Sequence, residues 1–428
     1  MTGKPMRGFG IAAVAIITLA CGAQQGQTSA TQTDVGVTKD TITIGGTFPV
    51  SGPATAYYSV AKGADAYFEY TNAHGGIGGR KIKYTVVDDA YSAANTPAKA
   101  RELVQDDQVF LTYGDLGTPN NLAVRDYYNQ QKVPQLFVFT GSSHWGADYT
   151  QYPWTLGWQP DYVSEGKIYA KYMLQNESSD KIGILYQNDD YGKDYVNGLK
   201  QGLGDKASSM IVKEVTYNTG DPIDMKSQVN ALKGSTADTF YVAATPNYAA
   251  NAVTNAIASG WNPKLYMNNV SNSTSTWRKV AGALGASSAK VDGMISTVYL
   301  KDPVDTAKWG SDSGVGLFKT VMSQFGGALA PSQPCPADGT DGFCVAGMAS
   351  AYSLVDLLKK ANADGQLTRK HVMDIACCGF NETNNPLLLP GEVVNTTKTN
   401  HFPIQEMQLE KWQSDHWVTF GQVIDARK

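Results

Sequence analysis

The chain has 428 residues, of which 42% are hydrophobic and 17% charged, and its formal net charge is −4. This length is enough for two or three ordinary domains with cores of normal size. The acidic balance and the lack of any Lys/Arg run exclude the basic footprint of a nucleic-acid-binding protein.

The first twenty residues are typical of a targeting segment. Lys4 and Arg7 form a short basic region, and the apolar run at residues 8–20 is too short to span a bilayer. We therefore predict a signal peptide at residues 1–20. The run ends in the letters TLAC, which resemble a bacterial lipobox, so we expect acylation of Cys21. Ordinary secretion with a later cleavage is the alternative, and both products are extracytoplasmic.

Residues 21–36 are rich in Gln, Thr and Ser, which predicts a flexible tether. Four cysteines follow Cys21, an even number that suits an oxidising compartment. Cys335 and Cys344 bracket a turn region, and we predict a disulfide between them. Cys377 and Cys378 are adjacent and their pairing stays open. The cysteine spacings match no zinc pattern, and we expect neither a metal nor a cofactor.

The first ordered segment reads as strand, loop, helix and strand. Alternation from Thr41 to Ile44 predicts a strand, an apolar stripe from Val60 to Thr71 predicts a helix, and residues 80–88 alternate again. This order is typical of a parallel crossover unit. Ligands of such sheets lie at the carboxyl ends of the strands, so the loop at residues 48–59 is the first candidate site.

The same alternation continues along the chain. We expect the helices and strands of one array up to residue 139, a functional or crossover loop at 140–160, and a second array from 161 onward. In the less regular last third we expect strands at 293–299, 387–394, 407–411 and 417–423. Two arrays of similar length predict an α/β fold with two doubly wound, mostly parallel-sheet lobes.

The lobes are expected to combine distant parts of the chain. We assign residues 37–160 and 291–400 to lobe 1, and residues 161–290 and 401–428 to lobe 2. A chain that returns to both lobes crosses between them more than once, which predicts a hinge of several segments.

Several short motifs, taken in order, resemble one known family. They include SGP at residues 51–53, NAHGGI at 72–77, QNDDYG at 187–192 and LPG at 389–391. Their order and spacing are similar to the Leu/Ile/Val-binding-protein family of type I extracytoplasmic solute-binding proteins. The resemblance covers residues 37–424. It implies a monomeric two-lobe trap that closes over a small solute and docks on an ABC permease.

The resemblance also places ligand contacts, one residue at a time. In lobe 1 it implies an aromatic in the first loop, matched by Tyr57 with Tyr58 as its neighbour, and a hydroxyl after the third strand. It also implies that backbone and hydroxyl groups after the fourth strand contact the ligand. In lobe 2 it implies contacts from an aromatic side chain and from the loops that follow two strands. The implied binding residues are Tyr57, Gly117, Thr118, Thr140, Gly141, Ser142, Tyr191, Thr245 and Asn269.

One position departs from the family pattern. Amino-acid-binding members carry an acidic residue where this chain has Asn268 and Asn269, and an amide does not neutralise a buried ammonium group. The solute class therefore stays open between an amino acid, a carboxylate and an amide. Asp189 or Asp190 restores the missing charge if either points into the cleft.

Two other functions were weighed against capture and transport. Ser142 and His144 stand close in sequence, but a serine hydrolase needs a base in hydrogen-bond reach and a third group to orient it, and neighbours in the chain rarely reach that geometry. No phosphate-binding or metalloprotease motif is present in the sequence. We expect no catalysis. A lipid-anchored sensory domain of the same fold is the remaining alternative.

Overall fold

The computed structural model describes residues 1–3, 31–327, 329 and 333–425. The fold described below is that of the unit that begins at Thr31. The signal peptide from residue 4 onward, Cys21 and the tether up to residue 30 lie outside the described residues.

The first lobe is built on a five-stranded sheet in which every pair of neighbours is parallel. Its strands, in spatial order, are β3 (Lys81–Asp88), β2 (Thr41–Phe48), β4 (Leu111–Tyr113), β5 (Gln135–Val138) and β6 (Thr155–Gly157). Strand β6 lies within the region expected to be a loop. Its three residues are too few to show a period.

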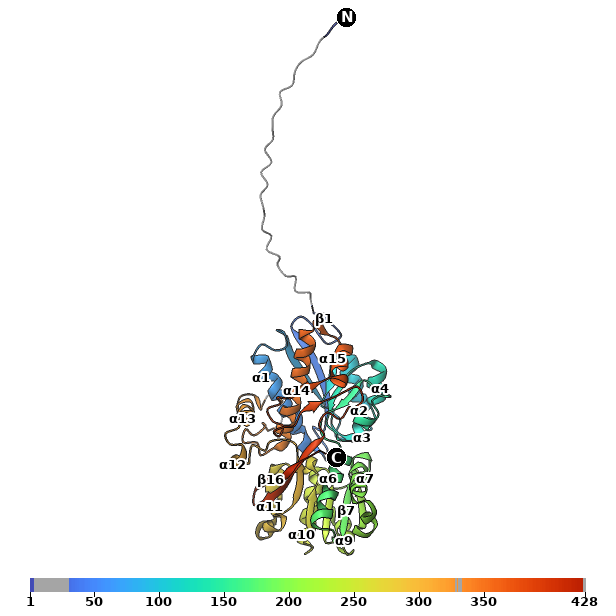
Figure 1. Ribbon diagram of the computed structural model, residues 1–428, viewed down its shortest axis with the longest axis vertical. Coiled ribbons are helices and arrows are strands. Elements are labelled where there is room, and N and C mark those ends of the chain that lie inside the picture. Colours follow the sequence, from blue (N-terminus) through green and yellow to red (C-terminus); the bar gives the residue numbers. More distant parts are fainter. Residues whose placement is uncertain (4–30, 328, 330–332, 426–428) are drawn as a thin grey trace. The chain divides into compact units, whose positions relative to one another are not determined.

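Helices from two distant parts of the chain lie around this sheet (Figure 1). The early ones are α1 (Tyr58–Ala73), α2 (Thr96–Arg101), α3 (Thr118–Leu122), α4 (Arg125–Gln131) and α5 (His144–Ala147). The late ones are α12 (Thr306–Trp309), α13 (Ser313–Phe325), α14 (Gly342–Ala363) and α15 (Arg369–Cys378). Both α13 and α14 pack against α1.

The second lobe contains a seven-stranded sheet. Its spatial order is β16 (His416–Asp425), β15 (Glu406–Gln413), β11 (Ile295–Val298), β10 (Lys264–Met267), β9 (Thr239–Ala243), β7 (Ile182–Gln187) and β8 (Ile211–Tyr217). The five strands from β11 to β8 are parallel, and β15 and β16 are antiparallel. Its helices are α6 (Tyr162–Asn176), α7 (Asp190–Leu203), α8 (Ala207–Met210), α9 (Lys226–Lys233), α10 (Pro246–Ala258) and α11 (Thr274–Leu284).

The two parallel arrays have the same strand order. Counted along the chain, each runs second, first, third, fourth, fifth, which is a doubly wound order with a switch point between its first and third strands. The prediction of two doubly wound, mostly parallel lobes is confirmed. Loops that follow β2, β4, β7 and β9 are therefore the ones placed at the crevices where such sheets bind ligands.

The chain passes between the two sheets after β6, after β11 and before β15. Strand β11 pairs with β10 and β15, so it belongs to the second sheet. The prediction that the chain re-enters lobe 1 at residue 291 is wrong, because β11 still belongs to the second sheet and the chain crosses after Val298. The other lobe boundaries remain predictions.

Two further segments differ from the sequence-based expectation. Gln32 and Thr33, expected in the tether, form β1 and pair in parallel with β12 (Gln366–Leu367). The strand expected at residues 387–394 is wrong: Leu388 only forms an isolated bridge with Leu300, and residues 394–395 form β14 (Val394–Asn395) with β13 (Asn381–Glu382). The apolar side chains at residues 387–389 are buried in the core, which explains the apolar run without a strand.

Helices α1 and α14 meet at two glycines. A Cβ at Gly347 would lie 2.0 Å from the Val60 carbonyl oxygen, and one at Gly63 would lie 2.1 Å from the Cys344 carbonyl oxygen. The missing side chains allow the two backbones to approach this closely. Cys344, in the first turn of α14, forms a disulfide with Cys335. A second disulfide joins Cys377 and Cys378 at the end of α15.

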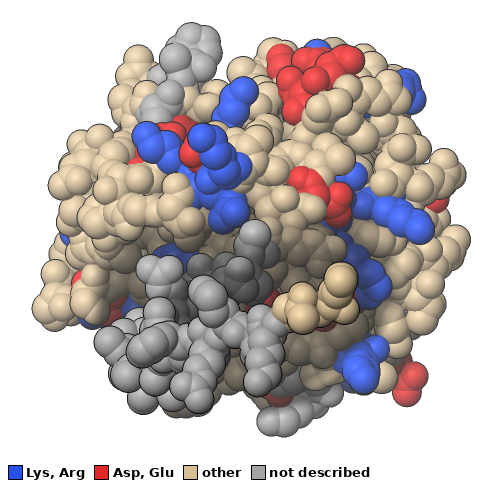
Figure 2. Space-filling model, turned by 90° about the horizontal axis from the view of Figure 1, so that it is seen from above, with Lys and Arg blue, Asp and Glu red and all other residues tan. Residues whose placement is uncertain are grey.

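On the face shown in Figure 2, acidic and basic side chains are interspersed on a largely uncharged surface. Within the residues that the structure describes, we find no helix with the length and apolarity needed to cross a membrane.

Candidate functional site

A cavity lies between the two lobes, at the carboxyl ends of strands from both sheets. It contains about 950 Å³ of space not filled by atoms, part of it continuous with solvent. Lobe 1 contributes the loops after β2, β4 and β5, and lobe 2 contributes the loops after β7, β10 and β11. The start of α14 completes the wall.

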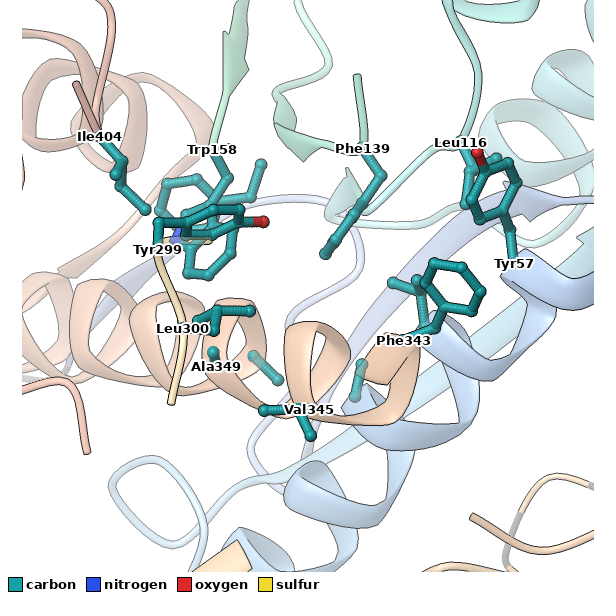
Figure 3. Packing of buried hydrophobic residues seen from close by; sticks show 14 of the residues in the cluster. Tyr57, Leu116, Phe139, Trp158, Tyr299, Leu300, Phe343, Val345, Ala349 and Ile404 are labelled. Carbon is teal, nitrogen blue, oxygen red and sulfur yellow. The ribbon is translucent and has the colours of Figure 1, made fainter. Parts of the chain in front are cut away.

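The wall is dominated by aromatic and aliphatic side chains. Figure 3 shows Tyr57, Phe139, Tyr299 and Phe343 converging from four separate segments. The rings of Tyr57 and Phe343 meet edge to face, with centroids 5.1 Å apart. Such a lining, with few polar groups, is typical of a small-molecule site.

Five of the nine residues implied by the resemblance line this cavity: Tyr57, Gly117, Thr118, Tyr191 and Asn269. They come from both lobes, and their role in binding stays a prediction. Gly117 has a φ of +102°, a conformation that favours glycine and that lets α3 begin at Thr118. The Thr118 hydroxyl shares a 2.6 Å hydrogen bond with the hydroxyl of Thr140.

The other four implied residues do not line the cavity. Thr140 lies behind Thr118, and Gly141 accepts a backbone hydrogen bond from Tyr162 at 2.7 Å. The hydroxyl of Ser142 donates to Asp194 at 3.0 Å. Thr245 begins α10 and its N–H donates to the Tyr217 hydroxyl. A register irregularity between Leu136 and Val138 in β5 changes the path of the segment that follows it, which sequence motifs did not reveal.

Several hydrogen bonds join the two lobes outside the lining of the cavity. Asp194 on α7 accepts the Ser142 hydroxyl and the Ser143 N–H, at 3.0 and 2.9 Å. On another side of the cleft, the Asn247 side chain of α10 donates to the Pro53 carbonyl oxygen at 2.8 Å. We call these hydrogen bonds the interlobe contacts. They join the described parts of the two lobes, and none of their residues lines the cavity.

Ser142 and His144 do not form a nucleophile–base pair. The Ser142 hydroxyl donates to Asp194, whereas the ring nitrogens of His144 lie 2.7 Å from Asp148 and 3.3 Å from Asp190. The arrangement therefore gives no support to the hydrolase alternative.

The aspartates that were expected to replace the missing charge are engaged elsewhere. Asp189 caps α7 by accepting the N–H groups of Tyr191 and Gly192, and Asp190 faces His144. Neither lines the cavity. The acids that do are Asp302 and Glu410. Sequence reasoning missed both, because they come from the last third, where the pattern of elements is least regular.

A third buried acid supports the wall from behind. Glu165 is fully buried and accepts hydrogen bonds from the hydroxyls of Tyr169 and Tyr195 and from the N–H of Asn269, at 2.7–2.8 Å. Burial raises the pKa of Glu165 to about 7. Glu165 therefore fixes the backbone of a cavity residue while remaining outside the cavity.

This raised pKa predicts a pH-dependent stability. An acid with a higher pKa in the folded state makes the free energy of unfolding greatest below its ordinary pKa of 4.5, with a loss of about 3 kcal/mol as the pH rises through about 7. Glu165→Gln should flatten that part of the profile, measured by urea unfolding from pH 4 to 8. Parallel profiles for the two proteins would contradict the assignment.

Comparisons with known proteins agree with this geometry. The sequence profile of the family described as periplasmic binding protein matches residues 41–416. The chain is 27% identical over 209 residues to the Leu/Ile/Val-binding protein homolog 3 of Brucella melitensis, covering 47% of this chain and 53% of that protein. An amino acid binding protein of Pseudomonas aeruginosa is 24% identical over 182 residues, covering 42% and 47%. The chain thus spans about half the length of the curated relatives it matches.

Solved structures share the fold over nearly the whole chain. A fatty acid ABC transporter substrate-binding protein from Thermomonospora curvata has a TM-score of 0.76 at 19% identity, covering 93% of this chain and 96% of that one. A branched chain amino acid ABC transporter protein from Thermus thermophilus, with bound valine, has a TM-score of 0.75 at 14% identity, covering 91% and 97%.

Proposed function

The chain belongs to the periplasmic binding protein family, and from this premise we propose that it captures a small solute between its two lobes and delivers it to an ABC permease. The family places it outside the cytoplasm. The cavity between the lobes supports capture, because residues of both lobes line it. We propose no catalytic step, since transport requires only noncovalent binding of the solute.

The chemistry of the cavity narrows the solute. Its aromatic and aliphatic wall suits a solute with an apolar body. Solved neighbours are described as binding fatty acids and valine, two solutes with apolar bodies and carboxylate groups. For this chain the sequence left an amino acid, a carboxylate or an amide open, and the choice depends on the polar groups in the wall.

A thermal-shift screen tests capture. The full chain is mixed in turn with branched-chain amino acids, aromatic acids, short aliphatic acids, amides and amines. A true solute raises the melting temperature in proportion to the logarithm of its concentration over its Kd. One class should stand out, and a response from none of them would contradict the proposal.

Thr118 supplies a sharper test within the cavity. Thr118→Val removes a hydroxyl at the wall and should weaken binding of the solute found in the screen by about 1–3 kcal/mol, because a solute oxygen loses its partner. Thr118→Ser keeps the hydroxyl and should retain the affinity. Calorimetry measures both, and equal affinity for T118V and the unaltered chain would remove Thr118 from the site.

Delivery is tested in cells. Deleting the chain while the permease remains should abolish uptake of the solute, and restoring it should rescue uptake. A normal uptake rate with a lost cellular response would instead favour a sensory role. We also propose anchoring through Cys21, which Cys21→Ser would abolish in a test of membrane-bound against released protein.

A further inference from the structure

Two acids, Asp302 and Glu410, lie in the wall of the cavity. Glu410 on β15 is 2% exposed, and its Oε1 accepts a hydrogen bond from the Asn272 side chain at 2.6 Å. Asn272 in turn accepts the indole N–H of Trp417 through its carbonyl oxygen. Asp302 follows β11, lies near Glu410, and accepts the Val304 N–H at 2.9 Å. Asp302 and Glu410 thus share one part of the wall with an aromatic ring.

The lining of the cavity, as far as the structure describes it, offers these acids no spare Lys or Arg, and His416, a neighbour of Asp302 outside the lining, lies 2.9 Å from Asp415. Of the described residues that line the cavity, Lys301 alone is a Lys or Arg. An ammonium group has three donors, and Lys301 directs them at the two carboxylate oxygens of Asp312 and the carbonyl oxygen of Pro386, at 2.9–3.0 Å. Lys301 is therefore committed to a pair outside the lining, and a solute carboxylate would find no free cation there.

An unpartnered donor lies in the same wall. Asn269 is 6% exposed, and its side-chain Nδ2 has no hydrogen-bond partner among the described residues. A buried amide donor without a partner costs free energy, so such groups usually have one. Asn269 therefore points to a ligand that brings a hydrogen-bond acceptor into the cavity.

The charge balance favours a cation in the ligand as well. Burial, with Asp302 nearby, raises the pKa of Glu410 well above its ordinary value, and burial raises the pKa of Asp302 to about 6. A cation placed between them favours their ionised forms and removes that penalty. Aromatic faces attract cations too, and Trp417, which also lines the cavity, is hydrogen-bonded to the same Asn272 that donates to Glu410.

We propose that Asp302 and Glu410 form a subsite for an ammonium group, so that the ligand is an organic cation with an apolar body and a hydrogen-bond acceptor for Asn269. This inference rests on the proposed capture function and names its ligand class. It moves the ammonium partner away from the position after β10, where Asn268 and Asn269 stand, to residues after β11 and on β15.

Three probes of similar shape test the charge. Phenylalaninol is a cation, phenylpropanediol replaces its amine by a hydroxyl, and phenyllactate carries a carboxylate. Calorimetry with the full chain should give the order cation, neutral, anion, with at least about a tenfold preference for phenylalaninol over phenylpropanediol. Equal affinities, or tighter binding of phenyllactate, would overturn the subsite.

Variants test the residues. Glu410→Gln is close in shape to a protonated Glu410 and can keep the bond from Asn272, so folding is preserved while the charge is lost. Glu410→Gln and Asp302→Asn should each lower the affinity for phenylalaninol by at least about tenfold and leave the affinity for phenylpropanediol unchanged. The control is Asp374→Asn, an exposed acid on α15 paired with Lys370, which should bind both probes as before.

The outcomes separate the two proposals. Unchanged phenylalaninol binding in E410Q and D302N, or an equal loss for phenylpropanediol, would show that the acids are structural and would overturn the subsite. If none of the three probes binds, the subsite is wrong as proposed, whereas the capture function fails only if the wider thermal-shift screen is also blank.

Discussion

Replacing Trp158 by Ala should lower the free energy of unfolding by about 3–5 kcal/mol. Trp158 is fully buried directly after β6, where the chain first leaves the first sheet. Its ring lies between Phe139 and Tyr299, with centroid distances of 6.1 and 5.8 Å, and its indole N–H donates to the Ser353 hydroxyl at 3.1 Å. Truncation leaves a large cavity and removes this hydrogen bond, and the packed rings and helix α14 around Trp158 limit collapse into the space.

Urea unfolding of the full chain measures the effect through the midpoint and slope of the transition. Trp158→Phe keeps an aromatic ring in the same place and should cost clearly less than W158A. If W158A unfolds at the same urea midpoint as the unaltered chain, the packing of Trp158 does not contribute to the stability of the fold.

Replacing Gly347 by Ala should cost about 3 kcal/mol, the upper part of the usual range for overpacking. The added methyl group would lie 2.0 Å from the Val60 carbonyl oxygen, far inside van der Waals contact. Both groups belong to helix backbones, so no side chain can rotate away. Helices α1 and α14 must instead separate, which loosens the packing on both sides of Gly63 and Gly347.

A matched helical glycine gives the control. Gly316 lies within α13, and a Cβ there meets nothing within 4 Å. Gly316→Ala should therefore stabilise the protein by about 0.5–1 kcal/mol, because Ala is the better helix former. The same change at two helical glycines should have opposite signs in urea unfolding. A gain in stability for G347A would show that the two helices are not in close contact.

The sequence was sufficient for the architecture because hydrophobic period is a local signal. Strands such as β3, β15 and β16 were predicted at or near their observed bounds, and the repeated alternation of elements predicted two lobes. Strands that depend on distant partners were missed or misassigned. Gln32 and Thr33 pair with β12 far along the chain, and β11 joins a sheet that sequence order alone did not assign to it.

The site was predicted in part for a related reason. Tyr57, Thr118 and Tyr191 follow strands whose ends face the cleft, so motif position was enough to find them. Thr140 and Ser142 follow β5, where a register irregularity changes the path of the chain. Glu410 and Asn269 are far apart in the sequence and come together in the wall through the crossings of the chain between the sheets. No local sequence pattern predicts that they lie in the same cavity.

The interlobe contacts have a kinetic consequence. Asp194 with Ser142, and Asn247 with Pro53, connect the lobes without facing the cavity. Because no residue of these contacts lines the cavity, a guest held as proposed would not touch them, and the contacts would slow the escape of different guests to a similar extent. Under the proposed capture function, residence time and selectivity would then depend on separate residues, each open to evolutionary change without the other.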